Sequence, residues 1–264
     1  MRKYLRFIIV AFNVQMIYRG SMMLRGVRDV ASVLFFVILW SALFKEQSVI
    51  KGFTFNAMVT YYILTKIIDQ IYSYEPSRLI TRDILTGDLS NYLTKPMKYF
   101  AYMMFLSIGR RFARSFMSIV LVILAFVFIP QYVFVSPNAS SFLFFCLSGF
   151  LSWLLLFECA FLLGTLSFWS SETSGIQTAF DQLVLVLGGS WVPLNLFPEA
   201  VTKITSILPF KYLYYNLVLV YQGKLSNNEL VWQFAMQFFW VAVLFLCCYL
   251  SWKRGVKTYA SFGK

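Results

Sequence analysis

Six blocks of apolar residues, each close to or above the length that crosses a bilayer, constrain this chain more than any other feature of its sequence. A transmembrane helix needs roughly 20 predominantly apolar residues, because the hydrocarbon core is about 30 Å thick. The blocks cover residues 30–44, 53–74, 102–129, 142–169, 176–191 and 230–252. Hydrophobic residues make up 59% of the chain and charged residues only 13%, which is more apolar than a soluble domain. The sequence therefore predicts an all-α, polytopic membrane protein in which residues 1–264 form a single transmembrane domain with six transmembrane helices.

Basic residues are concentrated in the segments that lie on one predicted side of the membrane. Seventeen of the 23 Lys and Arg residues lie in the N-terminal segment, in the C-terminal tail, and between the second block and the start of the third, against five in the segments of the opposite side. Cytoplasmic segments retain Lys and Arg, so both termini are predicted to be cytoplasmic. The same bias accounts for the net charge of +12 without a nucleic-acid partner.

The N-terminal segment is basic and only partly apolar. Arg2, Lys3 and Arg6 precede a short apolar run that is interrupted by Asn13 and then by Arg19. This run is shorter than the apolar core of a usual signal peptide. We therefore expect residues 1–27 to form an amphipathic helix on the membrane surface, with basic side chains near anionic lipid headgroups.

The polar segment of residues 75–98, after the second block, has helical periodicity of its own. Apolar residues recur at helical spacing over residues 79–84, Gly87 can end that helix, and a second short helix is predicted over residues 89–93. The charged residues of this segment that could contact a partner are Glu75, Arg78, Arg82, Asp83 and Asp88. Two interpretations stay open: a solvated loop whose surface charges decide little, or a rigid projection that a partner protein grips.

A stretch rich in glycine and proline follows the fifth block. Gly188 and Gly189 permit either a close helix approach or a loosened helix end. Pro193, Pro198 and Pro209 then divide residues 193–228 into short apolar pieces. These pieces predict broken helices on the external side, or a helical hairpin that dips into the membrane without crossing it.

Apart from the arginines in the first half of the third block, four charged residues lie inside the apolar blocks, where each costs on the order of 3 kcal/mol or more. Lys66 and Asp69 are three residues apart, so they can pair on one helix face. Glu158 lies in the middle of the fourth block and Asp181 lies early in the fifth. They could form the polar lining of a substrate path, or they could be structural hydrogen-bonding groups.

Several chemistries have no support in the sequence. The chain has no His, which excludes Ser-His and His-metal catalysis. It has no G-x-x-x-x-G-K-[ST] loop to hold ATP phosphates. Its four cysteines all lie in apolar stretches and read as buried thiols. We expect no catalytic, cofactor-binding or metal site in this chain.

Two motifs in the expected order resemble those of the ABC-2 type transporter permease family, in its uncharacterised branch. Residues 82–96, RDILTGDLSNYLTKP, are similar to its D-I-x-x-G-x-L-x-x-x-L-x-x-P segment. Residues 188–198, GGSWVPLNLFP, followed by Leu208-Pro209-Phe210, are similar to the family's proline-rich stretch after the fifth span. The resemblance covers essentially the whole chain and implies a type V exporter-like permease with an N-terminal elbow helix.

The resemblance also implies roles and partners. Residues 75–98 would form a coupling segment that seats in an ATPase, and residues 193–228 would form short helices at the external gate. The chain would be the permease subunit of an ABC exporter in the bacterial cytoplasmic membrane, paired with a second copy or a homologous permease. Two separate ATPase subunits would bind and hydrolyse ATP-Mg. Two alternatives are an ion-coupled secondary transporter that uses Glu158 and Asp181, and a membrane-embedded lipid-modifying enzyme.

Overall fold

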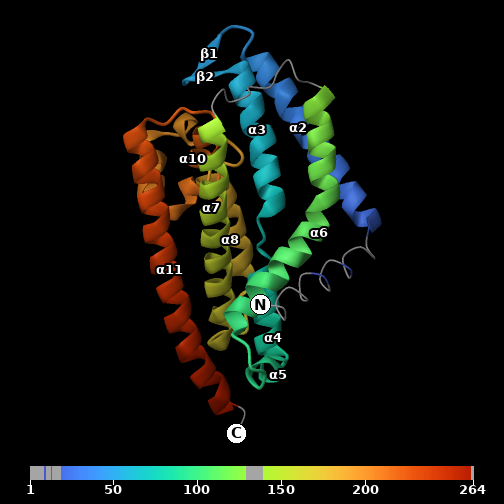
Figure 1. Ribbon diagram of the computed structural model, residues 1–264, viewed down its shortest axis with the longest axis vertical. Coiled ribbons are helices and arrows are strands. Elements are labelled where there is room, and N and C mark those ends of the chain that lie inside the picture. Colours follow the sequence, from blue (N-terminus) through green and yellow to red (C-terminus); the bar gives the residue numbers. More distant parts are fainter. Residues whose placement is uncertain (1–8, 10–12, 14–18, 129–138, 263–264) are drawn as a thin grey trace.

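The structure, a computed structural model, describes residues 9, 13, 19–128 and 139–262 and is mostly helical (Figure 1). Its long helices are α2 (Arg19–Leu43), α3 (Phe55–Ile71), α6 (Tyr99–Phe128), α7 (Ala139–Thr165), α8 (Ser174–Leu187) and α11 (Asn227–Phe262). Each coincides with one of the six predicted blocks, so the predicted helical fold class is confirmed.

Three of these helices have both the length and the apolar composition of a membrane span: Gly26–Leu43 within α2, Ser140–Phe168 in α7 and its extension, and Asn227–Tyr259 within α11. Of the other three, α3 has 17 residues and α8 has 14. α6 has 30 residues, in which Arg110, Arg111 and Arg114 precede an apolar stretch. The number of spans therefore stays a prediction.

Most of the predicted N-terminal surface helix lies outside the described residues. Within the described part, residues 19–27 are the first turns of α2 and continue directly into the apolar stretch that begins at Gly26.

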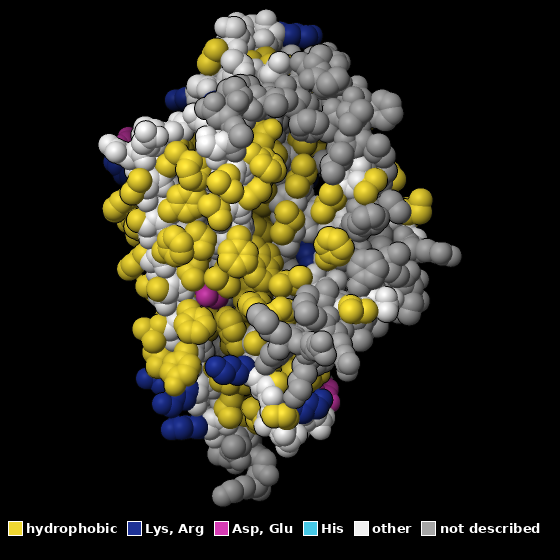
Figure 2. Space-filling model, viewed as in Figure 1, with side chains coloured by type: hydrophobic (Ala, Val, Ile, Leu, Met, Phe, Trp, Pro, Cys, Tyr) yellow, Lys and Arg dark blue, Asp and Glu magenta, His cyan; other side chains and the backbone are white. Residues whose placement is uncertain are grey.

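The helices run between two distinct ends of the molecule (Figure 1). One end carries α4 (Glu75–Leu85), α5 (Leu89–Leu93) and the C-terminal turns of α11. The other carries the antiparallel strands β1 (Val49–Ile50) and β2 (Phe53–Thr54), whose turn has positive φ at Lys51 and Gly52. Figure 2 shows hydrophobic side chains over the middle of one face, with basic side chains mainly toward the end of α4 and α5.

Residues 193–228 form a hairpin that enters the helix bundle and returns. It contains η3 (Leu194–Leu196), α9 (Glu199–Ile207), η4 (Pro209–Tyr212) and α10 (Tyr215–Tyr221). Asn195 Nδ2 donates to the Lys51 carbonyl over 2.6 Å, and Lys224 Nζ donates to the Gly52 carbonyl over 2.8 Å, both at the β1–β2 end. Between them, the Tyr212 carbonyl accepts a 2.7 Å bond from Ser152, near the middle of α7. The segment thus runs from the β1–β2 end to α7 and back, and whether it dips into the membrane stays a prediction.

Two clusters of buried side chains hold the bundle together. One joins α3, α7 and the hairpin around Tyr61, Leu155 and Leu217. The second joins α4, α5, the start of α6, the second half of α7 and α11 around Ile80, Phe161 and Cys248. The segment predicted to couple with a partner therefore rests on a packed core.

The second cluster depends on a close approach at Gly255 of α11. A Cβ atom there would lie 2.0 Å from Cδ2 of Phe168 in η2 (Leu166–Phe168). We expect Gly255→Ala to cost about 1–3 kcal/mol through overpacking, seen as a lower melting temperature of the purified protein in detergent. Gly175→Ala in α8, with no atom within 4 Å of the added carbon, is the control and should be neutral or slightly stabilising. Equal melting of the two variants would contradict the close approach.

Candidate functional site

α4 is a short helix whose sequence suits its position. Pro76 occupies its first turn, where a missing N–H is tolerated. Glu75 in the first turn and Arg82 in the last complement the helix dipole. Leu79, Ile80 and Ile84 of α4 are buried, and a Cβ on Gly164 of α7 would lie 2.7 Å from Cβ of Ile80. α4 is therefore pressed directly onto α7.

The turn after α4 confirms the predicted helix, glycine turn and second short helix. α4 ends at Leu85, Gly87 has φ of 84°, and α5 spans Leu89–Leu93. An L-residue is strained at this φ, so glycine is required there. The Ser90 hydroxyl donates to the Gly87 carbonyl over 2.8 Å, and the Thr86 hydroxyl donates to Asp88 over 2.8 Å. The turn is thereby fixed by its own side chains.

Asp83 lies inside the protein, unlike the other charged residues of this segment. Its side chain is 2% exposed. One oxygen accepts from the Tyr99 hydroxyl over 2.8 Å, and the other accepts from Arg82 over 3.0 Å. The hydrogen bond to Asp83 raises the pKa of Arg82. Asp83 therefore anchors α4 to the start of α6 and does not present its charge at the surface.

Two ion pairs tie the start and middle of α4 to other helices. Arg110 of α6 lies 3.0 Å from Glu75, and Arg78 lies 2.6 Å from Asp181 of α8. Three helices that the sequence separates widely, α4, α6 and α8, thus meet through their charged side chains. Asp181, predicted as an intramembrane polar residue, has its carboxylate in the second of these pairs.

The remaining surface of the segment forms a projecting tip, which we define as Arg82, Leu85, Gly87, Asp88 and Leu93. Leu85 is 50% exposed and Leu93 is 42% exposed, and Arg82 and Asp88 are also exposed. Apolar side chains beside charged ones on a fixed turn are typical of a surface that a protein partner covers.

One contact of the tip could not be predicted from the sequence. The Tyr259 hydroxyl, near the C-terminal end of α11, donates to the Gly87 carbonyl over 3.0 Å. The C-terminal segment, predicted only as a basic tail, is the end of this helix and braces the turn. The spacing of Val256 and Tyr259 in the sequence indicates only that one face of this segment is packed, and both residues do pack against the second cluster.

The predicted intramembrane residues lie on three helices: Lys66 and Asp69 on α3, Glu158 on α7 and Asp181 on α8. Lys66 and Asp69 form no ion pair in the described part of the chain, and the Asp69 carboxylate accepts from the Tyr214 hydroxyl over 2.9 Å. Glu158 is 1% exposed, and within the described residues its Oε2 has no hydrogen-bond partner. Their role as the lining of a substrate path stays a prediction.

The glycines and prolines of the external side have structural positions. A Cβ on Gly188 would lie 2.9 Å from the Tyr214 ring, and Gly189 has φ of 84°. Both interpretations of Gly188-Gly189 apply, because α8 ends at Leu187 with Gly188 as its C-cap residue, and both glycines have close neighbours. Pro193 and Pro198 precede η3 and α9, and Pro209 begins η4. Among the described residues, no group of His, Cys, Asp or Glu side chains could hold a metal ion.

Residues 30–263 match the family described as ABC-2 family transporter protein. No curated protein and no solved structure matches the chain. The match covers most of the sequence, so the chain belongs to the ABC-2 family of transporter proteins. Members of this family are transmembrane subunits of ABC transporters, and with its long apolar helices this chain is a multi-pass membrane protein.

The anchor at Asp83 gives a stability prediction. Tyr99→Phe removes a buried donor and leaves one carboxylate oxygen of Asp83 without it, so we expect a loss of about 1–3 kcal/mol. The melting temperature of the purified protein should fall accordingly. Tyr249→Phe is the control, because the Tyr249 side chain is 55% exposed and should leave melting unchanged. If Tyr99→Phe melts like the wild type, Asp83 does not anchor α4.

Proposed function

We propose that this chain is the permease subunit of an ABC exporter, driven by two copies of a separate ATPase that bind ATP-Mg. The observation that carries the proposal is the projecting tip, a surface held in a fixed position on the buried core. A lever must be rigid to transmit a movement. The tip meets this requirement, since Asp83, Gly87 and Ile80 are each held by another helix.

The tip also has the chemistry of a reversible protein interface. Leu85 and Leu93 can enter an apolar groove, while Arg82 and Asp88 set its orientation through charged contacts. Movement of the ATPases on ATP binding would push α4, which contacts α6, α7 and α8. The helices would then alternate between inward-open and outward-open arrangements.

We further propose six spans, an N-terminal elbow helix, and both termini in the cytoplasm of a bacterial cell, with the chain in the cytoplasmic membrane. Support comes from the basic residues of α4, of the first half of α6 and of the last turns of α11, because α4 and the end of α11 lie at one end of the molecule. The β1–β2 turn and the two ends of the hairpin, at the opposite end of the molecule, would face the exterior.

A second permease packed against α8 would complete the substrate path. In the described part of α8, buried residues are few, and Thr178 and Gln182 are exposed next to Leu183. A carboxamide exposed to hydrocarbon is unfavourable, whereas facing polar side chains of two helices can bond to each other. We propose a second copy of this chain, or a homologous permease, against this face.

The two alternatives have weaker support. An ion-coupled transporter would use Glu158 and Asp181 together, but Asp181 is paired with Arg78 and Glu158 lies on a different helix in a packed core. A lipid-modifying enzyme would need several acidic or metal-binding groups clustered at one membrane face, and the described residues hold no such metal-binding group.

The coupling role is tested by charge reversal at the tip. Arg82→Glu and Asp88→Lys should reduce the amount of ABC ATPase that co-purifies with the permease from native membranes. An unpaired charge in a buried interface can cost about 2–5 kcal/mol of binding, while a solvated charge changes stability by about 0.5 kcal/mol or less.

The control for this experiment is Lys203→Glu on the opposite end. Lys203 is 75% exposed and pairs only with the exposed Glu199 among the described residues, so its reversal should leave ATPase recovery unchanged. Equal recovery of the ATPase with all three variants would show that the tip is an ordinary solvated loop. Asp83→Lys is unsuitable for this comparison, since it would place a charge in the core.

The permease pairing is tested by cross-linking. In a chain that lacks its four native cysteines, Gln182→Cys should give a disulfide-linked dimer under mild oxidation, because two facing α8 helices would bring the thiols within bonding reach. Leu246→Cys, on an exposed position of α11, is the control and should stay monomeric. Dimer formation at residue 246 but not at residue 182 would contradict the α8 interface.

A further inference from the structure

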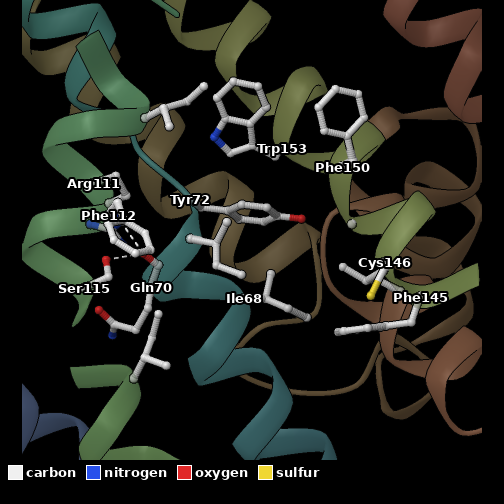
Figure 3. Close-up of a pocket in the computed structure, with 15 residues that line it drawn as sticks. Ile68, Gln70, Tyr72, Arg111, Phe112, Ser115, Phe145, Cys146, Phe150 and Trp153 are labelled. Carbon is white, nitrogen blue, oxygen red and sulfur yellow. Dashed lines mark hydrogen bonds between the residues drawn. The ribbon is translucent and has the colours of Figure 1, made fainter. Parts of the chain in front are cut away.

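A cavity of about 440 Å³ opens on the flank of the bundle between α3, α6 and α7 (Figure 3). Its walls are mainly apolar, with Ile68, Phe112, Phe145 and Trp153 around it. Phe112 and Phe150, which line it, are also exposed on the outside of the molecule. The cavity is therefore open toward the surface that we assign to the bilayer.

The cavity exists because two groups of helices diverge. α6 packs against α2 and α3, whereas α7 packs against α4, α10 and α11. α3 ends at Ile71, and the backbone is extended at Tyr72 before α4 begins at Glu75. The interrupted helix leaves room beside Tyr72 that neither neighbouring helix fills (Figure 3).

One edge of the cavity is polar and basic. Arg111 Nε donates to the Gln70 carbonyl over 2.6 Å, and the Arg111 guanidinium also donates to the Asp69 carbonyl. A cation at the C-terminal end of a helix is favourable, which accounts for the position of Arg111. The Ser115 hydroxyl donates to the same Gln70 carbonyl (Figure 3).

Arg111 also lines a second, polar cleft, together with Arg78 and Arg82. Three arginines and Glu75 are among the residues that line this cleft, whose volume is about 540 Å³. Arg78 also pairs with Asp181, and Arg82 with Asp83. The apolar cavity and the basic cleft therefore meet at a single residue. The cleft lies beside α4, so in the proposed orientation it is at the level of the cytoplasmic headgroups.

We propose that the joined cavity and cleft bind an anionic lipid from the cytoplasmic leaflet, with its acyl chain in the cavity and its acidic headgroup in the cleft. The proposal rests on the orientation in the proposed function and names the chemical class that this flank would accept. A soluble anion would leave the apolar cavity empty, and a neutral lipid would bring no net charge to the arginines of the cleft. An inner-leaflet lipid satisfies both, since its headgroup and chain already have this order and direction.

Trp153 provides a local probe, because it lines the cavity and brominated acyl chains quench tryptophan fluorescence on contact. The purified chain is placed in vesicles with increasing fractions of brominated phosphatidylglycerol or brominated phosphatidylcholine. The difference between the wild type and Trp153→Phe isolates the signal of Trp153. We expect this signal to be quenched at lower fractions of the phosphatidylglycerol than of the phosphatidylcholine.

Two kinds of variant separate chain from headgroup. Gly149→Leu and Cys146→Phe fill the cavity and should abolish the quenching by both lipids. A Cβ on Gly149 meets only Leu217 at 4.0 Å, and Cys146 is exposed, so both variants should fold. Arg82→Gln should weaken the phosphatidylglycerol response about fivefold, the effect of one basic side chain near anionic lipid, and leave the phosphatidylcholine response unchanged. Lys253→Gln, an exposed cation elsewhere on the same end, is the matched control and should change neither.

Equal responses to the two lipids in the wild type, or equal loss in Arg82→Gln and Lys253→Gln, would overturn the proposal and describe an ordinary lipid-facing surface. Absence of quenching specific to Trp153 would overturn it as well. The readout involves neither ATPase nor transport. Failure of ATPase co-purification would thus contradict the proposed function without changing this result, and failure here would leave the coupling role intact.

Discussion

The structure depends on satisfying backbone carbonyl groups where helices are interrupted within the bundle. In hydrocarbon, an unpaired carbonyl costs several kcal/mol, so irregular backbone is tolerated only where protein groups bond to it. Tyrosine hydroxyls supply many of these bonds. Tyr62 donates to the Trp191 carbonyl over 2.7 Å, and Tyr61 and Tyr72 donate to Gly189 and Leu213 over 2.5 Å each. The chain between α8 and α10 can enter the bundle because Tyr61 and Tyr62 of α3, and Tyr72 just after it, supply these donors.

The same principle explains the extended break between α3 and α4. The last carbonyls of α3 would be unpaired at the break, and Arg111 and Ser115 of α6 bond to them. The preceding residue, Arg110, pairs with Glu75 at the start of α4. Arg110 and Arg111 of α6 thus hold both sides of the interruption. They keep α3 and α4 in a defined relation although no continuous helical backbone joins them.

The local elements could be predicted from the sequence because their signals are local. The glycine turn at Gly87, the two short helices around it and the short helices between Pro193 and α11 follow from spacing and from turn residues. Burial of charge could not be read in the same way. Asp83 repeats the spacing of Leu79 and Ile80, which was a sign of the buried face, but its partner Tyr99 lies on another helix. Asp69 likewise bonds to Tyr214, 145 positions away, whereas the spacing to Lys66 offered a nearer and incorrect partner.

This arrangement bears on how a push at the tip would spread through the bundle. α4 is held to α7 at Gly164 and to α8 through Asp181, and the tip is held to α11 through Tyr259, so these elements would move with α4. α3 is connected to α4 through the short extended stretch at Tyr72 and through the arginines of α6. The break between α3 and α4 is therefore where this region can bend. A displacement of α4 would change the gap between α3, α6 and α7, which is the gap that forms the lateral cavity. Coupling and lipid binding, proposed from separate observations, would then act on the same hinge.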